Sequence, residues 1–190
     1  MYIISGCNGA GKTTASFTIL PEILKVKEFV NADEIAKGLS PFRPENVAFE
    51  AGRIMLRRID ELMEHNVSFA FETTLATKSY IHRIRKAQKQ GYHVVLLFFW
   101  LRDVRLAIER VRIRVQEGGH NIEKNVIRRR YKRGIHNFHR LYKDVADEWM
   151  LIDNSEGVFD LIAVKESGGK IIIIKEVKFT FFNNSTDTPV

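Results

Sequence analysis

The chain is 190 residues long, and 45% of its residues are hydrophobic. This length suits one well-cored domain, and the hydrophobic content excludes a mainly disordered chain. The formal net charge is +7, and the segment from Arg102 to Arg133 carries all of that excess, with eleven Lys or Arg against four Asp or Glu. We expect a single domain over residues 1–182 and a polar tail over residues 183–190.

Composition also bears on the compartment. The single cysteine, Cys7, excludes an intramolecular disulfide and favours a reducing environment. No apolar run is long enough to span a bilayer, and the first predicted strand begins at residue 1, so we expect neither a signal peptide nor a membrane contact. These features predict a cytoplasmic protein.

The first predicted elements are a short buried strand over residues 1–4 and a helix over residues 14–24. The loop between them fits the phosphate-binding pattern G-x-x-x-x-G-K-S/T and reads Gly6-Cys7-Asn8-Gly9-Ala10-Gly11-Lys12-Thr13. Glycines in such a loop let backbone N–H groups approach a polyphosphate, and the helix N-terminus adds unpaired donors.

This loop predicts a site for ATP with Mg²⁺. Lys12 would reach the β- and γ-phosphates, and the hydroxyl of Thr13 would hold the metal. The residues expected to bind ATP are Gly6, Asn8, Gly9, Ala10, Gly11, Lys12, Thr13 and Thr14.

A brief strand over residues 28–31 follows, and Asp33 comes just after it. A carboxylate at a strand end can orient or deprotonate an acceptor hydroxyl. Asp33 is also consistent with a Mg²⁺ ligand, or with the N-cap of a helix that begins near Glu34. The sequence does not separate these roles.

A long helix with Pro44 in its first turn is predicted to run to about residue 66, and a strand over residues 67–71 follows it. This strand is closed by Glu72-Thr73-Thr74, whose carboxylate and hydroxyls can bind a substrate or the water shell of a metal. A capping box for the next helix is the alternative. No hydrophobic strand ends in Asp in the Walker B manner, which disfavours a motor ATPase and favours a small kinase.

The later elements complete an α/β pattern. A basic helix over residues 76–90 precedes the apolar run 93–101, which is typical of a central parallel strand. A fifth strand is expected over residues 148–152, and strands 159–164 and 171–177 form a β-hairpin around two glycines. This order predicts a three-layer, P-loop kinase-like fold with a mainly parallel five-stranded sheet and a C-terminal hairpin at one margin.

Between these strands lie two arginine-rich helices, over residues 103–117 and 123–146, separated by Gly118-Gly119-His120-Asn121. We expect residues 102–133 to form a mobile lid over the phosphates. Arg114 precedes the break, and Arg128, Arg129 and Arg130 follow it. His120 is expected to touch phosphate or to have no role. His136 and His139 have no matching carboxylate, so metal ligation is not expected there.

Taken together, these motifs resemble the zeta toxin family over roughly residues 1–155. The resemblance implies a P-loop kinase that phosphorylates the 3′-hydroxyl of UDP-N-acetylglucosamine and is often held inactive by a small antitoxin protein. It implies that Asp33 is the base, and that the lid arginines stabilise the transferring phosphoryl group. The implied catalytic residues are Lys12, Asp33, Arg114, Arg129 and Arg130. The implied substrate-binding residues are Asp33, Glu72, Thr73 and Thr74. The second lid arginine is not assigned uniquely within residues 128–130.

The basic segment also allows a nucleic-acid-binding protein or a polynucleotide 5′-end kinase. Single-stranded nucleic acid is usually bound on stacking aromatic side chains, and Tyr131 is the one aromatic residue in the segment. A solvated helical face has the same composition. We therefore expect a small anionic substrate and no nucleic acid.

Overall fold

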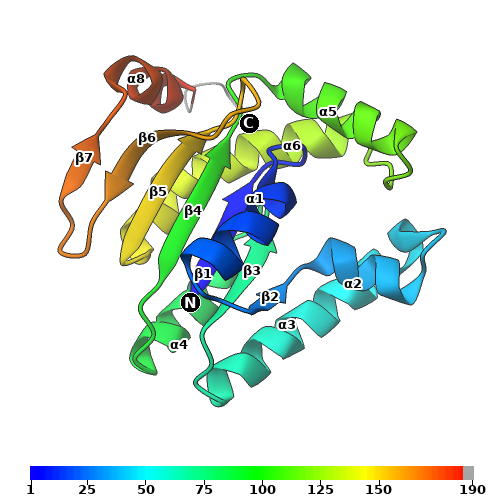
Figure 1. Ribbon diagram of the computed structural model, residues 1–190, viewed down its shortest axis with the longest axis horizontal. Coiled ribbons are helices and arrows are strands. Elements are labelled where there is room, and N and C mark those ends of the chain that lie inside the picture. The colour runs from blue at the N-terminus through cyan, green and yellow to red at the C-terminus, as the bar shows by residue number, and fades with distance from the viewer. Residues whose placement is uncertain (186–190) are drawn as a thin grey trace.

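Within residues 1–185, which the computed structural model describes, seven strands form one sheet in the order β2-β3-β1-β4-β5-β6-β7 (Figure 1). The strands are β1 (Tyr2–Gly6), β2 (Glu28–Val30), β3 (Phe69–Thr73), β4 (Val95–Trp100), β5 (Glu148–Asp153), β6 (Asp160–Lys165) and β7 (Ile171–Ile173).

The five strands from β2 to β5 in this order are parallel to one another, as the alternation of strands and helices predicts. Strand β6 pairs antiparallel with β5, and β7 pairs antiparallel with β6. The hairpin therefore continues the same sheet, which raises the strand count from the predicted five to seven. The mainly parallel α/β fold and the marginal hairpin are confirmed.

The α-helices of the described residues are α1 (Lys12–Thr18), α2 (Ala32–Leu39), α3 (Ala48–Glu64), α4 (Tyr80–Lys89), α5 (Val104–Gln116), α6 (Lys124–Asn137), α7 (Lys143–Val145) and α8 (Glu176–Asn184). Helix α1 is shorter than predicted because a π-helical segment, Ile19–Ile23, follows it and contains Pro21, which cannot donate an α-helical hydrogen bond. A second π-helical segment, Phe138–Tyr142, joins α6 to α7.

Two buried clusters lie on opposite faces of the sheet, since successive side chains of a strand alternate between faces. Ile3 and Phe98 belong to one cluster, together with side chains of α3, α4 and α8. Ile4 and Phe99 belong to the other, together with side chains of α1 and α5. Strand β4 is buried along its whole length, which explains its nearly continuous apolar sequence.

The prediction for residues 171–177 is partly wrong. Strand β7 ends at Ile173, and the chain then forms α8 instead of a longer strand. Phe182 lies three residues after the partly buried Phe179 and packs into the core. This tertiary packing of a helix outweighs the strand propensity of the β-branched residues that precede it. Helix α8 also includes Asn183 and Asn184, which were expected in the tail; residues 186–190 of that tail lie outside the described residues.

Membrane-spanning segments were sought among the helices of residues 1–185. No helix there has both the length and the apolar character needed to cross a membrane.

We predict that Phe182→Ala destabilises the fold strongly. The ring is fully buried and packs on Phe98, Trp100 and Phe138, with centroid distances of 5.9, 5.5 and 5.6 Å. Truncating a buried phenylalanine costs about 3–5 kcal/mol of unfolding free energy, measurable by urea denaturation. Val177→Ala on the same helix is the control, because Val177 is exposed and should change stability by less than about 0.5 kcal/mol. Equal effects of the two variants would show that α8 does not pack on the core.

Candidate active site

The glycine-rich loop owes its shape to close backbone packing. Gly6 and Gly11 have φ angles of +139° and +84°, which side-chain-bearing residues rarely adopt. A Cβ atom at Gly6 would collide with the carbonyl oxygen of Phe99, and one at Gly11 would collide with the amide nitrogen of Asn154. Larger residues are therefore excluded at both positions, and the loop leads directly into the N-terminus of α1.

Lys12, the first residue of α1, is buried, with 5% of its side chain exposed. Its ammonium donates a hydrogen bond to the carbonyl oxygen of Cys7 at 3.0 Å and forms an ion pair with Oε1 of Glu72 at 3.3 Å. The neighbouring Thr13 hydroxyl donates to Oε2 of Glu72 at 2.8 Å. The Glu72 carboxylate near the end of β3 thus contacts both Lys12 and Thr13 of the phosphate-binding motif.

Glu72 also connects the loop to α2. Asn31 donates from Nδ2 to Oε2 of Glu72 at 2.9 Å, and its Oδ1 accepts from the backbone N–H groups of Asp33 at 2.8 Å and Glu34 at 3.4 Å. Asn31 is therefore the N-cap of α2, and the cap role considered for Asp33 is wrong. Asp33 lies in the first helical turn, with 45% of its side chain exposed and free to meet a ligand.

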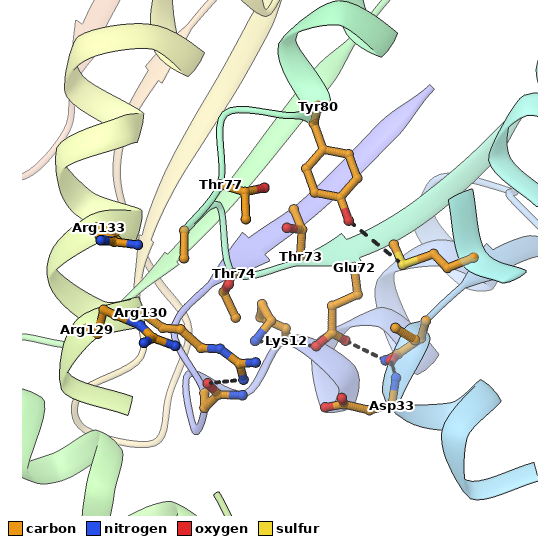
Figure 2. A pocket seen from close by; sticks show the side chains of 15 residues that line it. Lys12, Asp33, Glu72, Thr73, Thr74, Thr77, Tyr80, Arg129, Arg130 and Arg133 are labelled. Carbon is orange, nitrogen blue, oxygen red and sulfur yellow. Dashed lines mark hydrogen bonds and ion pairs between the residues drawn. The ribbon is translucent and has the colours of Figure 1, made fainter. Parts of the chain in front are cut away.

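These side chains surround one cavity of about 330 Å³. Figure 2 shows three arginines of α6 entering it from one side, with Glu72 and Asp33 opposite and Lys12 between them. Its lining residues are Asn8, Lys12, Asn31, Ala32, Asp33, Met55, Glu72, Thr73, Thr74, Ala76, Thr77, Tyr80, Arg129, Arg130 and Arg133. The cavity brings together predicted ATP-binding, catalytic and substrate-binding residues from four separate stretches of the chain.

The loop after β3 is fastened to α6, which explains why arginines of that helix face the cavity. Asn137 donates to the carbonyl oxygen of Leu75 at 2.7 Å, and the Tyr142 hydroxyl donates to that of Thr77 at 2.6 Å. A Cβ atom at Gly134 would lie 2.7 Å from the carbonyl oxygen of Thr74, so only glycine permits this approach.

The arginine run after the lid break divides between two environments. Arg129 and Arg130 line the cavity, and Arg130 donates to Oδ1 of Asn8 at 3.2 Å. Burial lowers the pKa of Arg130, and the charge of Asp33 opposes that shift. Arg128 is exposed and donates to Asn125 of its own helix at 3.1 Å. Arg133, which we did not predict, lines the cavity one turn beyond Arg129.

Arg114 lies outside the residues that line this cavity. Its Nη2 donates to the carbonyl oxygen of His120 at 3.5 Å, and its side chain packs against Gly119. His120 also lies outside that lining, with its Nε2 3.9 Å from Oδ2 of Asp33. Burial lowers the pKa of His120, and the charge of Asp33 opposes that shift.

Two residues that support the phosphate loop escaped the sequence analysis. Arg110 donates to the carbonyl oxygens of Asn154 at 2.7 Å, Ser155 at 3.2 Å and Gly9 at 3.4 Å. Asn154, just past the end of β5, donates to the carbonyl oxygen of Ala10 at 2.9 Å. The strand-end position of Asn154 is a signal that could have identified it. Arg110 is hidden in sequence among neighbouring arginines that face solvent.

The end of β5 is in turn tied to the C-terminal helix. Lys178 of α8 donates to Asp153 at 2.7 Å and to Asp160 of β6 at 2.8 Å. Asp153 also accepts from the backbone N–H of Ser155 at 2.8 Å. The turn that carries Asn154 is thereby held between two neighbouring strands and α8.

Metal-binding clusters were sought among residues 1–185. No group of three or more His, Cys, Asp or Glu side chains there could hold a metal ion. Next to the phosphate loop, the oxygen donors are the Thr13 hydroxyl and the Glu72 carboxylate. Magnesium prefers such oxygen donors and commonly takes its remaining ligands from substrate phosphates and water, so this pair fits a Mg²⁺–nucleotide complex.

Comparison with known proteins assigns the chain to a family. The family model for zeta toxins matches residues 1–175. The chain belongs to the zeta toxin family. As a member of this family, it is a phosphotransferase of the P-loop kinase type.

A sequence relative and two solved structures illustrate the likeness. An uncharacterized protein of Haemophilus influenzae is 29% identical over 126 residues, which cover 66% of this chain and 88% of the relative. The AvrRxo1-ORF1:-ORF2 crystal structure with ATP matches with a TM-score of 0.79 and 16% identity, covering 100% of this chain and 64% of that one.

The second solved structure is that of the PezAT chromosomal toxin-antitoxin system of Streptococcus pneumoniae. It matches with a TM-score of 0.66 and 14% identity, covering 99% of this chain and 88% of that one. At these identities, the two structural matches show a shared fold. This chain spans less than two thirds of the AvrRxo1 chain that it matches.

We predict that Arg110→Ala loosens the phosphate loop. The charged guanidinium donates to three carbonyl groups, so its loss should reduce the unfolding free energy by about 2 kcal/mol. Affinity for an ATP analogue, measured by calorimetry, should fall by about tenfold or more. Arg112→Ala is the matched control on the same helix, because Arg112 is exposed and, within residues 1–185, pairs with the side chain of Glu109. Similar results for both variants would contradict the supporting role of Arg110.

Proposed function

We propose that this protein is an ATP-dependent kinase that transfers the γ-phosphoryl group to a hydroxyl of UDP-N-acetylglucosamine. The observation that carries the proposal is the shared cavity, where Lys12 of the phosphate loop and Asp33 of α2 face the same space. Family membership supports the reaction type, and the structurally similar AvrRxo1-ORF1:-ORF2 crystal structure with ATP supports the donor. The nucleotide sugar is suggested by the family resemblance.

The donor side of the cavity is prepared for a polyphosphate. Backbone N–H groups of the glycine-rich loop and the N-terminus of α1 would surround the phosphates. Lys12 would turn from Glu72 to the β- and γ-phosphates, and Thr13 would hold Mg²⁺ together with the nucleotide. The metal, when bound, neutralises charge on the phosphate oxygens. The turn at Asn154 and Arg110 keeps the loop from spreading as the ligand enters.

The acceptor side supplies a base and positive charge. Asp33 would take the proton of the acceptor hydroxyl. The hydroxyl oxygen would form a bond to the γ-phosphorus while the bond between the γ-phosphorus and the β-phosphate oxygen breaks, which releases ADP. Arg129 and Arg130 would balance the charge on the transferring phosphoryl group. Thr73 and Thr74 offer hydroxyl groups to the sugar or its diphosphate. Arg114 would reach the phosphates only if the lid moves, because it packs behind the break.

We also propose that a small antitoxin protein inhibits this enzyme. The family resemblance implies such a partner, and the similar structure from Streptococcus pneumoniae belongs to a toxin-antitoxin system. An inhibitor that covers the cavity would block both substrates at once, because donor and acceptor residues share it.

We predict different losses at Lys12 and Asp33. Lys12→Ala should abolish turnover and weaken ATP binding, because it removes a charge that the bound ground state uses. Asp33→Asn should keep ATP binding and reduce turnover by about 10²–10⁴-fold, as expected for loss of a general base. Calorimetry with an ATP analogue gives the affinities, and mass spectrometry of UDP-N-acetylglucosamine incubated with Mg-ATP gives turnover.

Two results would contradict these assignments. Only ADP and free phosphate across a panel of nucleotide sugars would exclude a nucleotide-sugar acceptor. Loss of nucleotide affinity in Asp33→Asn equal to that in Lys12→Ala would make Asp33 a metal ligand instead of a base.

We predict that Arg130→Ala lowers turnover by about a thousandfold or more, as arginines that stabilise a transferring phosphoryl group do. Arg130 lines the cavity and contacts Asn8 of the phosphate loop. Arg128→Ala is the control from the same arginine run and should retain most activity, because Arg128 points to Asn125. The same phosphorylation assay measures both variants. A larger loss of turnover in Arg128→Ala than in Arg130→Ala would assign the catalytic role to Arg128 instead.

A further inference from the structure

Glu72 occupies a particular position in the sheet. Strand β3 pairs in parallel with β1, and Glu72 lies opposite Ile4, two residues before the phosphate loop. In P-loop nucleotide hydrolases, an Asp at the end of a hydrophobic strand and the Ser or Thr of the loop hold Mg²⁺ together. Strand β5 ends in Asp153, contrary to the expectation that no hydrophobic strand ends in Asp, but this carboxylate accepts from Lys178 and lies outside the residues that line the cavity. The longer glutamate side chain reaches the Thr13 hydroxyl at 2.8 Å.

The surroundings of Glu72 tie it to the phosphate loop. Its side chain is 10% exposed and is neutralised by Lys12 at 3.3 Å. Both Lys12 and Thr13 belong to the phosphate-binding motif, and both are expected to contact the loaded nucleotide. A polyphosphate that binds in the loop would draw Lys12 away from Glu72. It would also bring its own negative charge close to the Glu72 carboxylate, which Lys12 would then neutralise less. A divalent cation between the two anionic groups would remove that repulsion.

We propose that Glu72 is the carboxylate of the Mg²⁺ site, and that Lys12 and Thr13 turn from it to the phosphates and the metal when the nucleotide binds. This inference rests on the ATP-dependent transfer proposed above and deepens it. The resemblance to zeta toxins implies a substrate contact for Glu72. The geometry points instead to the donor side, because two of the three polar partners that Glu72 has within residues 1–185 are Lys12 and Thr13.

The third partner explains how the carboxylate stays in place on loading. Asn31 is buried, donates to Oε2 of Glu72 at 2.9 Å and caps α2 through its own oxygen. This contact does not involve the phosphate loop, so it persists when Lys12 turns to the phosphates. Asn31 thus holds the carboxylate of the metal site and the backbone N–H of Asp33 at the same time. The metal site and the base are joined by one side chain.

The proposal predicts that Glu72 sets the metal dependence of nucleotide binding. Without Mg²⁺, the carboxylate repels the phosphates and competes for Lys12; with Mg²⁺, it favours the complex. Glu72→Gln keeps the shape and a hydrogen-bonding oxygen but removes the charge. This variant should therefore bind nucleotide more tightly than the natural protein in EDTA and should lose about 10–100-fold of the enhancement by Mg²⁺.

Calorimetry with AMP-PNP, a non-hydrolysable ATP analogue, tests this in excess Mg²⁺ and in EDTA. The natural protein, Glu72→Gln and Asp33→Asn are compared. A second readout uses Mn²⁺ in place of Mg²⁺, with electron paramagnetic resonance measuring how much metal is bound in the presence of AMP-PNP. We expect Glu72→Gln to weaken Mn²⁺ retention and Asp33→Asn to preserve it. Circular dichroism checks that each variant is folded.

The outcomes separate this inference from the proposed function. If the natural protein binds no AMP-PNP under either condition, the proposed ATP-dependent function fails. If it binds AMP-PNP and Glu72→Gln keeps the full Mg²⁺ enhancement and Mn²⁺ retention, the metal role of Glu72 is overturned. If Asp33→Asn alone loses the metal dependence, Asp33 is the metal-site carboxylate and the proposal for Glu72 also fails.

Discussion

The interaction on which the site depends is the pairing of a buried ammonium group with a buried carboxylate at the carboxyl edge of the sheet. An isolated charge at either position would be costly, because burial removes most of its hydration. Lys12 comes from the loop after β1 and Glu72 from the end of β3, so their contact requires these strands to be adjacent and in register. The parallel pairing of β3 with β1 is therefore a condition for this ion pair.

The same edge of the sheet positions part of the positive charge of the chain. Helix α6 is fastened to the loop after β3 through Gly134 and Asn137, and this contact presents Arg129, Arg130 and Arg133 to the cavity. Other arginines of the basic segment pair with nearby side chains, as Arg112 does with Glu109. Some arginines of this basic segment therefore line the cavity, whereas others form ion pairs on the protein surface.

Much of the fold and part of the site follow from short-range sequence signals. The phosphate loop is recognisable because its glycines, Lys12 and Thr13 must stand at fixed spacing, and Glu72 stands out as a polar residue that closes a buried strand. Arg110 and Arg133 could not be distinguished from solvated arginines, because their roles depend on which way a helix faces after packing. Helix α8 was missed because an isoleucine-rich run precedes it and the burial of Phe182 is a tertiary effect.

The contacts of α8 give the end of the chain an unexpected connection with its beginning. Lys178 donates a hydrogen bond to Asp153 at the end of β5. The next residue, Asn154, donates to the carbonyl oxygen of Ala10 in the phosphate loop. The family match ends at residue 175, before this helix begins. A segment beyond the residues that the family model matches therefore braces the phosphate loop. A change in this final helix is therefore expected to alter nucleotide affinity while leaving every residue that lines the cavity unchanged.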